Sequence, residues 1–137
     1  MSGQIKEYLF AYGLLKTEYR SNPKYQVPHM NVTFVSSGTL SGKLYHISHY
    51  PGFVFDEASP KVYGEIFQIN DPDFFTDMDE YECAKPLYKG SHEYVRRKRK
   101  VETTDHHFVE CWVYEYDKPI EGLEIIINGN FSPTTQS

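Results

Sequence analysis

The sequence has few cysteines and no long run of apolar residues. Of its 137 residues only Cys83 and Cys111 are cysteine, and they lie far apart without CxxC spacing. A disulfide framework or a thiolate zinc site is therefore not expected. No window approaches the roughly 18 apolar residues of a membrane span, and the opening MSGQIKEYLFAYG contains no apolar run of signal-peptide length. These absences predict a cytoplasmic protein with no membrane partner.

The chain also lacks a surplus of positive charge. It carries 14 Lys and Arg against 19 Asp and Glu, a net charge of -5, which does not favour nucleic acid binding by the protein as a whole. The concentrated basic run RRKRK, residues 96–100, lies in an expected strand, where alternate side chains face opposite sides. Because only part of the run would share one surface, no nucleic acid partner is expected. The competing hypothesis for this run is a nucleic-acid-binding or ligand-binding module without catalysis.

Aromatic residues, in contrast, are abundant and recur in short apolar segments. The chain holds 12 Tyr, 9 Phe and 1 Trp. Segments rich in Val, Ile, Tyr and Phe alternate with Gly, Pro and Ser, which is typical of strands: EYLFAYG, NVTFVSS, GTLSGKLYHI, VYGEIFQI, YVRRKRKVE and FVECWVYEY. The segment RSNPKYQVPHM is expected to hold a short helix, and TTDHH, residues 103–107, a hairpin tip.

These segments predict an α+β fold, a compact mixed β-barrel-like sheet with a few flanking helices. The length suits one domain over residues 1–137, with an ordered core of about 6–131.

The segment NDPDFFTDMDEYEC contains the start signals of a helix, predicted over about residues 72–82. Asp71 can cap free backbone N–H groups, and Pro72 suits the first helical position. At about 100° per residue an apolar stripe forms on one face, made of Phe74, Phe75, Met78 and Tyr81. Asp73, Asp77 and Glu80 point away from this stripe, and Asp79 lies at its edge.

Glu82 is the one carboxylate of this helix that combines an inward direction with a long side chain. Burying a carboxylate costs several kcal/mol unless it is paired or neutralised, and the helix C-terminus disfavours negative charge. Both effects raise the pKa of Glu82 toward the range that suits a general base. The alternative is that the helix ends one residue earlier and Glu82 reaches solvent or pairs with Lys85.

Six segments, in matching order and spacing, resemble the γ-glutamylcyclotransferase-like family. They are YGLLK (12–16), GTLSGKLYHI (38–47), YPG (50–52), VYGEIFQI (62–69), MDEYECAKPLY (78–88) and WVYEY (112–116). The similarity covers most of residues 8–131. It implies a β-barrel-like domain whose cavity accepts a γ-glutamyl group, with cyclisation of that group to 5-oxoproline and release of the amine to which it was attached.

The resemblance also implies roles for particular residues. The acid/base glutamate of the family corresponds to Glu82. Its substrate loop corresponds to Tyr12, Gly13, Leu14 and Leu15, and the tyrosine after its acidic motif corresponds to Tyr88.

The expected partner is a small-molecule γ-glutamyl amide, and the oligomeric state is not predicted. No cofactor or metal is expected, because the substrate carries its own nucleophile, an α-amino group that can close a five-membered ring. Glu82 can move the proton in both directions, and backbone N–H groups of the loop can bind the developing oxyanion.

The sequence departs from the family pattern at three places. Leu14 stands where the family has a small hydroxyl residue, Cys83 stands where it has Gly, and NGNF, residues 128–131, stands where many members have Gly-Asp-Trp. A left-handed helix cap is less natural at a cysteine than at a glycine. These departures leave the amine unspecified, and the alternative hypothesis is a non-catalytic small-ligand or protein-binding member of the same fold.

Other reactive residues form no recognisable site in the sequence. His46 lies close to His49 and His106 lies next to His107, but the second pair suits a solvated hairpin tip and adjacent strand residues diverge, so no metal site is expected. Cys83 has no identifiable His partner, so it is expected to pack rather than to act as a nucleophile.

Overall fold

The computed structural model describes residues 6–48, 50–85, 90 and 92–132. The strands in this part of the chain are β1 (Glu7–Ala11), β2 (Val32–His46), β3 (Pro51–Phe55), β4 (Lys61–Ile69), β5 (Ala84–Lys85), β6 (Tyr94–Thr103), β7 (Phe108–Tyr116) and β8 (Glu124–Ile125). The helices are α1 (Thr17–Arg20), the short 3₁₀ helix η1 (Pro23–Tyr25) and α2 (Phe74–Glu82). Tyr88 lies outside the described residues.

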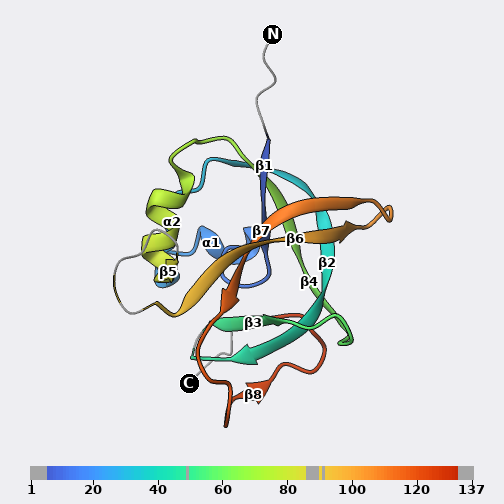
Figure 1. The fold of residues 1–137 in the computed structure, drawn as a ribbon. Helices are drawn as coiled ribbons and strands as arrows, with labels where there is room; N and C mark the ends of the chain where they lie inside the picture. Colours follow the sequence, from blue (N-terminus) through green and yellow to red (C-terminus); the bar gives the residue numbers. More distant parts are fainter. Residues whose placement is uncertain (1–5, 49, 86–89, 91, 133–137) are drawn as a thin grey trace.

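Five of the strands close into a small barrel (Figure 1). β1 pairs with β4, β4 with β2 and β6 with β7, all antiparallel. The ring is completed by β2 against β6, where Gly38 faces Thr103, and by β7 running parallel to β1, where Leu9 faces Trp112. β3 and β8 extend the sheet beyond one end of the barrel by pairing with the last part of β2. The predicted α+β fold with a barrel-like sheet is therefore confirmed.

Two glycines allow the strands of the barrel to approach closely. Gly38 of β2 lies opposite Gly64 of β4. A Cβ atom at Gly38 would lie 2.8 Å from Cγ1 of Val101, and one at Gly64 would lie 2.5 Å from the carbonyl oxygen of Ala11. Since neither gap admits a side chain, glycine is required at both of these positions, where β2 pairs with β4 in the barrel wall.

Two apolar clusters fill the molecule. The barrel interior is occupied by Phe10, Leu40, Leu44, Val62, Ile66, Val101 and Val113. The second cluster joins the sheet to α2, which packs on one side of the barrel together with α1 and β5 (Figure 1). Its members include Leu9, Phe67, Phe74, Met78 and Tyr114. None of the helices in the described part of the chain is long and apolar enough to cross a membrane.

The local structure differs from the sequence-based expectation in two places. NVTFVSS and GTLSGKLYHI form one continuous strand, β2, with a register shift between Phe34 and Ser36 rather than a break. Helix α2 begins at Phe74 rather than at residue 72. The reason is that the Asp71 carboxylate accepts a hydrogen bond from the amide of Asp73 (2.9 Å), which holds Pro72 in a turn before the helix.

Candidate active site

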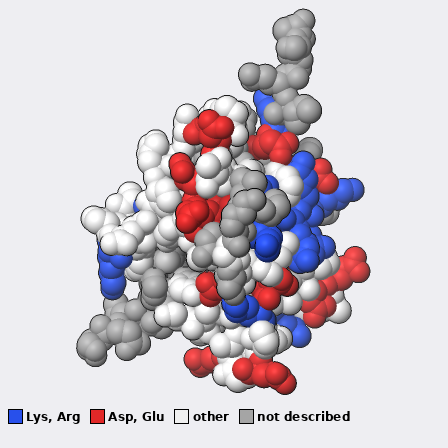
Figure 2. All heavy atoms as spheres, turned by 60° about the vertical axis from the view of Figure 1, so that its left-hand side comes forward, with Lys and Arg blue, Asp and Glu red and all other residues white. Residues whose placement is uncertain are grey.

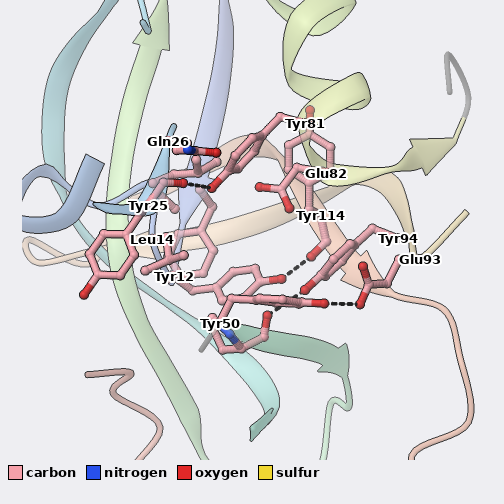
Figure 3. A pocket seen from close by; sticks show the side chains of 15 residues that line it. Tyr12, Leu14, Tyr25, Gln26, Tyr50, Tyr81, Glu82, Glu93, Tyr94 and Tyr114 are labelled. Carbon is pink, nitrogen blue, oxygen red and sulfur yellow. Dashed lines mark hydrogen bonds between the residues drawn. The ribbon is translucent and has the colours of Figure 1, made fainter. Parts of the chain in front are cut away.

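A cavity of about 370 Å³ lies where β1 runs into the loop that follows it. Its wall also includes η1, the start of β3, the end of α2, the start of β6 and part of β7. Among the described residues, six tyrosines line it, Tyr12, Tyr25, Tyr50, Tyr81, Tyr94 and Tyr114. In the same part of the chain, the ionisable carboxylates of the wall are those of Glu82 and Glu93 (Figure 3). Four of the five residues predicted for the substrate site thus line the same cavity as Glu82, and the fifth, Tyr88, lies outside the described residues.

Glu82 is the last residue of α2, and its carboxylate points into the cavity (Figure 3). The prediction that the helix reaches Glu82 is confirmed. Within the described part of the chain, no donor forms a hydrogen bond with this half-buried carboxylate. Desolvation is the largest effect on the group, followed by the negative charges of Glu93 and Asp79, and together they raise the pKa of Glu82 to about 8.

The end of α2 is fixed by the backbone of Cys83. This residue adopts a left-handed conformation (φ 52°, ψ 53°), and its amide donates to the carbonyls of Asp79 and Glu80. The left-handed cap therefore forms at this cysteine despite the lack of glycine. The Cys83 carbonyl accepts a hydrogen bond of 2.7 Å from the amide of Glu93, and so the helix end and the start of β6 bring Glu82 and Glu93 to the same cavity.

Asp79, which the helical projection places at the edge of the apolar stripe, has a fully buried side chain. Its two oxygens accept hydrogen bonds of 2.9 and 3.0 Å from the guanidinium of Arg96, and one of them also accepts a hydrogen bond of 2.7 Å from the Tyr114 hydroxyl. The Arg96 guanidinium in turn stacks on the ring of Phe75, 3.7 Å from its centroid. The positive charge of Arg96 on β6 compensates the buried negative charge of Asp79. A projection of the helix alone does not reveal this pairing.

The loop after β1 forms the opposite wall of the cavity. Tyr12, Leu14 and Leu15 are all buried, and the Tyr12 hydroxyl donates to the carbonyl of Tyr114. A Cβ atom at Gly13 would lie 2.7 Å from Cγ of Pro51, so glycine is needed for the close approach of this loop to the start of β3. The hydrogen bond that closes the turn joins the Lys16 amide to the Gly13 carbonyl (3.0 Å) and does not use the amides of residues 13–15.

Several residues of the wall were not singled out in the sequence. Tyr50 and Tyr114 lie in the motifs YPG and WVYEY, which were quoted for the resemblance without a role. Glu93 directly precedes the basic strand β6 and Tyr94 begins it, and no local sequence pattern marks either residue. Only the pairing of β6 with β5 and the Cys83 contact place Glu93 in the wall.

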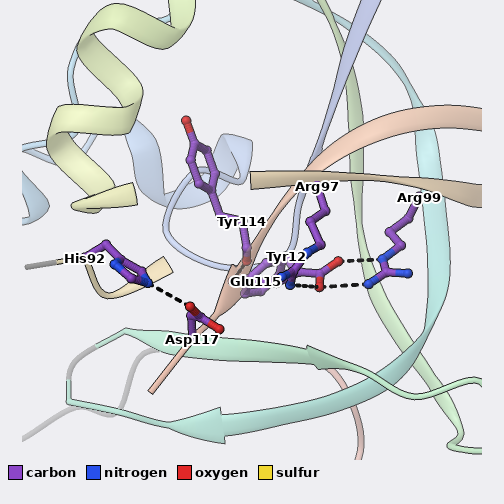
Figure 4. A network of polar contacts seen from close by, with 7 residues as sticks. All are labelled: Tyr12, His92, Arg97, Arg99, Tyr114, Glu115 and Asp117. Atoms are coloured by element: carbon purple, nitrogen blue, oxygen red, sulfur yellow. Dashed lines mark hydrogen bonds and ion pairs between the residues drawn. The ribbon is translucent and has the colours of Figure 1, made fainter. Parts of the chain in front are cut away.

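The basic run of β6 is divided between the two faces of the sheet, as predicted. Arg97 and Arg99 both contact the buried carboxylate of Glu115, at 3.2 Å and 2.6 Å (Figure 4). Alternation along the strand places them on the face opposite to Arg96. Lys98 lies 3.5 Å from a carboxylate oxygen of Glu7. Figure 2 shows acidic side chains close to the basic ones on the face in view. Much of the positive charge is therefore paired within the protein.

No group of three or more His, Cys, Asp or Glu side chains in the described ranges is placed to hold a metal ion. Both cysteines are free thiols. Burial raises the pKa of Cys111 to about 12, so that thiol is inert at neutral pH.

The chain is similar in sequence to a known protein family and in fold to solved structures. A family described as gamma-glutamyl cyclotransferase, AIG2-like, matches residues 9–133. The gamma-glutamylcyclotransferase family protein ytfP of Citrobacter rodentium is 27% identical over 124 residues, which cover 90% of this chain and 93% of that protein.

Two solved structures show the same fold. An AIG2-like protein from Mus musculus is 20% identical with a TM-score of 0.64, covering 98% of this chain and 100% of that one. Protein ytfP from Escherichia coli is 22% identical with a TM-score of 0.63, covering 90% and 95%. Because the family match extends over most of the sequence, the chain belongs to the AIG2-like γ-glutamyl cyclotransferase family.

Proposed function

We propose that the protein cyclises a γ-glutamyl amide to 5-oxoproline and releases the amine, with Glu82 as the general acid and base. The observation that carries the proposal is a carboxylate without a hydrogen-bond donor among the described residues, which points into the cavity and has its pKa raised to about 8. A base with a pKa near the working pH can both accept and return a proton. Structural carboxylates of this protein, such as Asp79, are instead fully paired.

The chemistry balances with Glu82 alone. Glu82 first takes a proton from the α-ammonium of the substrate. The neutral α-amino nitrogen then attacks its own γ-carbonyl carbon, which forms the new C–N bond of the ring, and the protonated Glu82 gives its proton to the amine nitrogen as the old C–N bond breaks. The ionised Glu82 finally takes the second proton from the ring nitrogen, and this proton leaves with the released amine as its ammonium. Bringing the two ends of one substrate together in a cavity supplies much of the rate without a cofactor.

The loop after β1 is the proposed binding site for the developing oxyanion. The amides of residues 13–15 are not used by the hydrogen bond of the turn, and these three residues line the cavity. Gly13 packs against Pro51 and keeps the backbone close to the cavity. Backbone donors held in this way stabilise negative charge without rearranging. Leu14 contributes its backbone and an apolar surface, in place of a hydroxyl.

Four tyrosines of the wall remain neutral at the pH at which Glu82 titrates. Desolvation is the first cause that raises the pKa of Tyr12, Tyr94 and Tyr114 well above the usual value, and it raises the pKa of Tyr81 to about 12. They therefore act in the proposed site as hydrogen-bonding and packing groups rather than as bases.

The proposal is tested by incubating the protein with a panel of γ-glutamyl amides while 5-oxoproline is measured. Glu82→Gln should reduce turnover at least about 100-fold, because an amide cannot carry the proton. Glu80→Gln is the matched control, since Glu80 is exposed on the same helix, and it should keep the rate of the unchanged protein. EDTA should leave the rate unaltered.

Binding of these amides without formation of 5-oxoproline would overturn the enzymatic proposal in favour of the non-catalytic alternative. Near-normal turnover of Glu82→Gln would instead remove Glu82 from the mechanism.

A further inference from the structure

Among the described residues of its wall, the cavity is acidic at one end and uncharged at the other. Glu82 and Glu93 lie at the end formed by α2 and β6, whereas the loop of residues 12–15 forms the other end (Figure 3). No Lys, Arg or His belongs to the described residues of the wall. A ligand with one positive and one negative group therefore has a favoured orientation, with its cation toward the two carboxylates.

Glu93 is held in place by both its backbone and its side chain. Its amide donates to the Cys83 carbonyl (2.7 Å), and its carbonyl accepts a hydrogen bond from the amide of Asp117 (2.9 Å). The Tyr50 hydroxyl donates a hydrogen bond of 2.6 Å to its Oε2 atom. Its Oε1 atom receives no hydrogen bond from the described residues. The carboxylate is thus oriented in the cavity wall with one oxygen available to a ligand.

We propose that Glu93 binds the α-ammonium of the γ-glutamyl group, an inference that rests on the proposed function. The γ-glutamyl group carries one ammonium and one carboxylate. Repulsion by Glu82 and Glu93 directs the substrate carboxylate away from the acidic end of the cavity. The ammonium then lies beside Glu82, which must receive its proton.

The contact between Glu93 and the α-nitrogen of the substrate also serves after the first proton has moved to Glu82. Once Glu82 has taken one proton, the neutral α-amine still has two N–H groups, and one of them can donate to Glu93 Oε1. This hydrogen bond fixes the direction of the nitrogen lone pair toward the γ-carbonyl carbon, which is the geometry that ring closure requires. Tyr50 keeps the accepting carboxylate from rotating away.

Glu93 also belongs to the charges that act on Glu82. The charged or titratable groups around Glu82 are Glu93, Asp79 with its partner Arg96, and the hydroxyls of Tyr12, Tyr81, Tyr94 and Tyr114. Because Glu93 disfavours the ionised form of Glu82, removing its charge should move the acidic limb of the pH–rate profile to lower pH. A merely structural role of Glu93 would not give this shift.

The decisive experiment measures binding without turnover. The two probes are γ-glutamyl methylamide and N-methylglutaramate, which is the same molecule without the α-ammonium. In Glu82→Gln, calorimetry should show at least about tenfold tighter binding of the probe with the ammonium. The added change Glu93→Gln should remove most of this preference, because the amide keeps the Tyr50 hydrogen bond and loses the charge. The added change Glu80→Gln should not affect it.

The outcomes separate this inference from the proposed function. The inference is overturned when the double variant keeps the preference, or when Glu82→Gln binds neither probe or binds both equally. If the preference depends on Glu93 while the unchanged protein forms no 5-oxoproline, the inference stands and the enzymatic proposal falls. Should Glu93→Gln unfold, Tyr50→Phe provides the second variant, and it should weaken the preference by releasing the carboxylate.

Discussion

Cys83 holds a backbone conformation that is unfavourable for its side chain. A left-handed residue other than glycine costs about 1–2 kcal/mol, whereas glycine loses about 0.5–1 kcal/mol more backbone entropy on folding. We therefore expect Cys83→Gly to raise the free energy of unfolding by about 0.5–1 kcal/mol in urea titrations. Cys83→Ala, which keeps the strain and loses side-chain contacts, should give no gain. Equal stability of the two variants would show that side-chain packing outweighs the backbone strain at this position.

At the residue scale, the sequence was sufficient to predict the direction of the Glu82 side chain. It was not sufficient to predict the burial of Asp79 or the place of Glu93 in the cavity. The direction of Glu82 follows from helical periodicity alone, which depends on local geometry. The burial of Asp79 depends on Arg96, seventeen positions later in the chain, and the place of Glu93 in the cavity depends on the contact of its amide with Cys83. Such long-range pairings are not encoded in any local pattern, which is why the projection of one helix does not predict the burial of Asp79.

At the element scale, the pairing of Asp79 with Arg96 fastens α2 to β6. Both side chains are buried, with exposed fractions of 0% and 7%. We expect Asp79→Asn to lower the free energy of unfolding by about 3–5 kcal/mol, since it leaves the Arg96 guanidinium buried without its counter-charge. Because α2 also carries Glu82, turnover should fall as well. Asp77→Asn, on the exposed face of the same helix, should change stability by less than about 0.5 kcal/mol.

The elements themselves were largely predictable from the sequence. Alternating apolar segments predicted the strands, and the hairpin tip at 103–107 is confirmed by the hydrogen bond from the Thr103 amide to the His107 carbonyl (2.8 Å). The start of α2 was misplaced because the Asp71 side chain makes a turn that competes with helix capping. The joining of two expected strands into β2 could not be foreseen, because a bulge resembles a break when only the sequence is read.

At the scale of the whole molecule, closure of the barrel depends on the absence of a side chain at Gly38. The contact between β2 and β6 that completes the ring is made at this residue. A methyl group here would meet Val101 and Ile66 at 2.8 and 2.9 Å. We expect Gly38→Ala to reduce the free energy of unfolding by about 1–3 kcal/mol, the usual cost of overpacking. Ser37→Ala, at the exposed neighbouring position, is the control, and an equal effect of both changes would contradict this explanation.

Stability and activity of the whole protein should respond to pH in opposite directions because of one group. The pKa of Glu82 is about 8 in the folded protein and 4.5 in its reference state, so the folded state binds more protons between these values. The stabilising effect of the protonated group is complete below about pH 4.5 and is lost as pH rises through about 8. Turnover should rise over the upper part of the same window, as Glu82 ionises.

This linkage can be isolated by comparing the unchanged protein with Glu82→Gln in urea titrations at about pH 5 and about pH 9. Other titrating groups contribute equally to both proteins, so their difference reports Glu82. Between the two pH values, we expect the free energy of unfolding of the variant to rise by at least about 1 kcal/mol relative to that of the unchanged protein. This amount is discounted for solvent screening, because one side of the carboxylate faces the cavity. If this difference stays flat while turnover still rises near pH 8, the group that limits the rate is the substrate ammonium and not the Glu82 carboxylate.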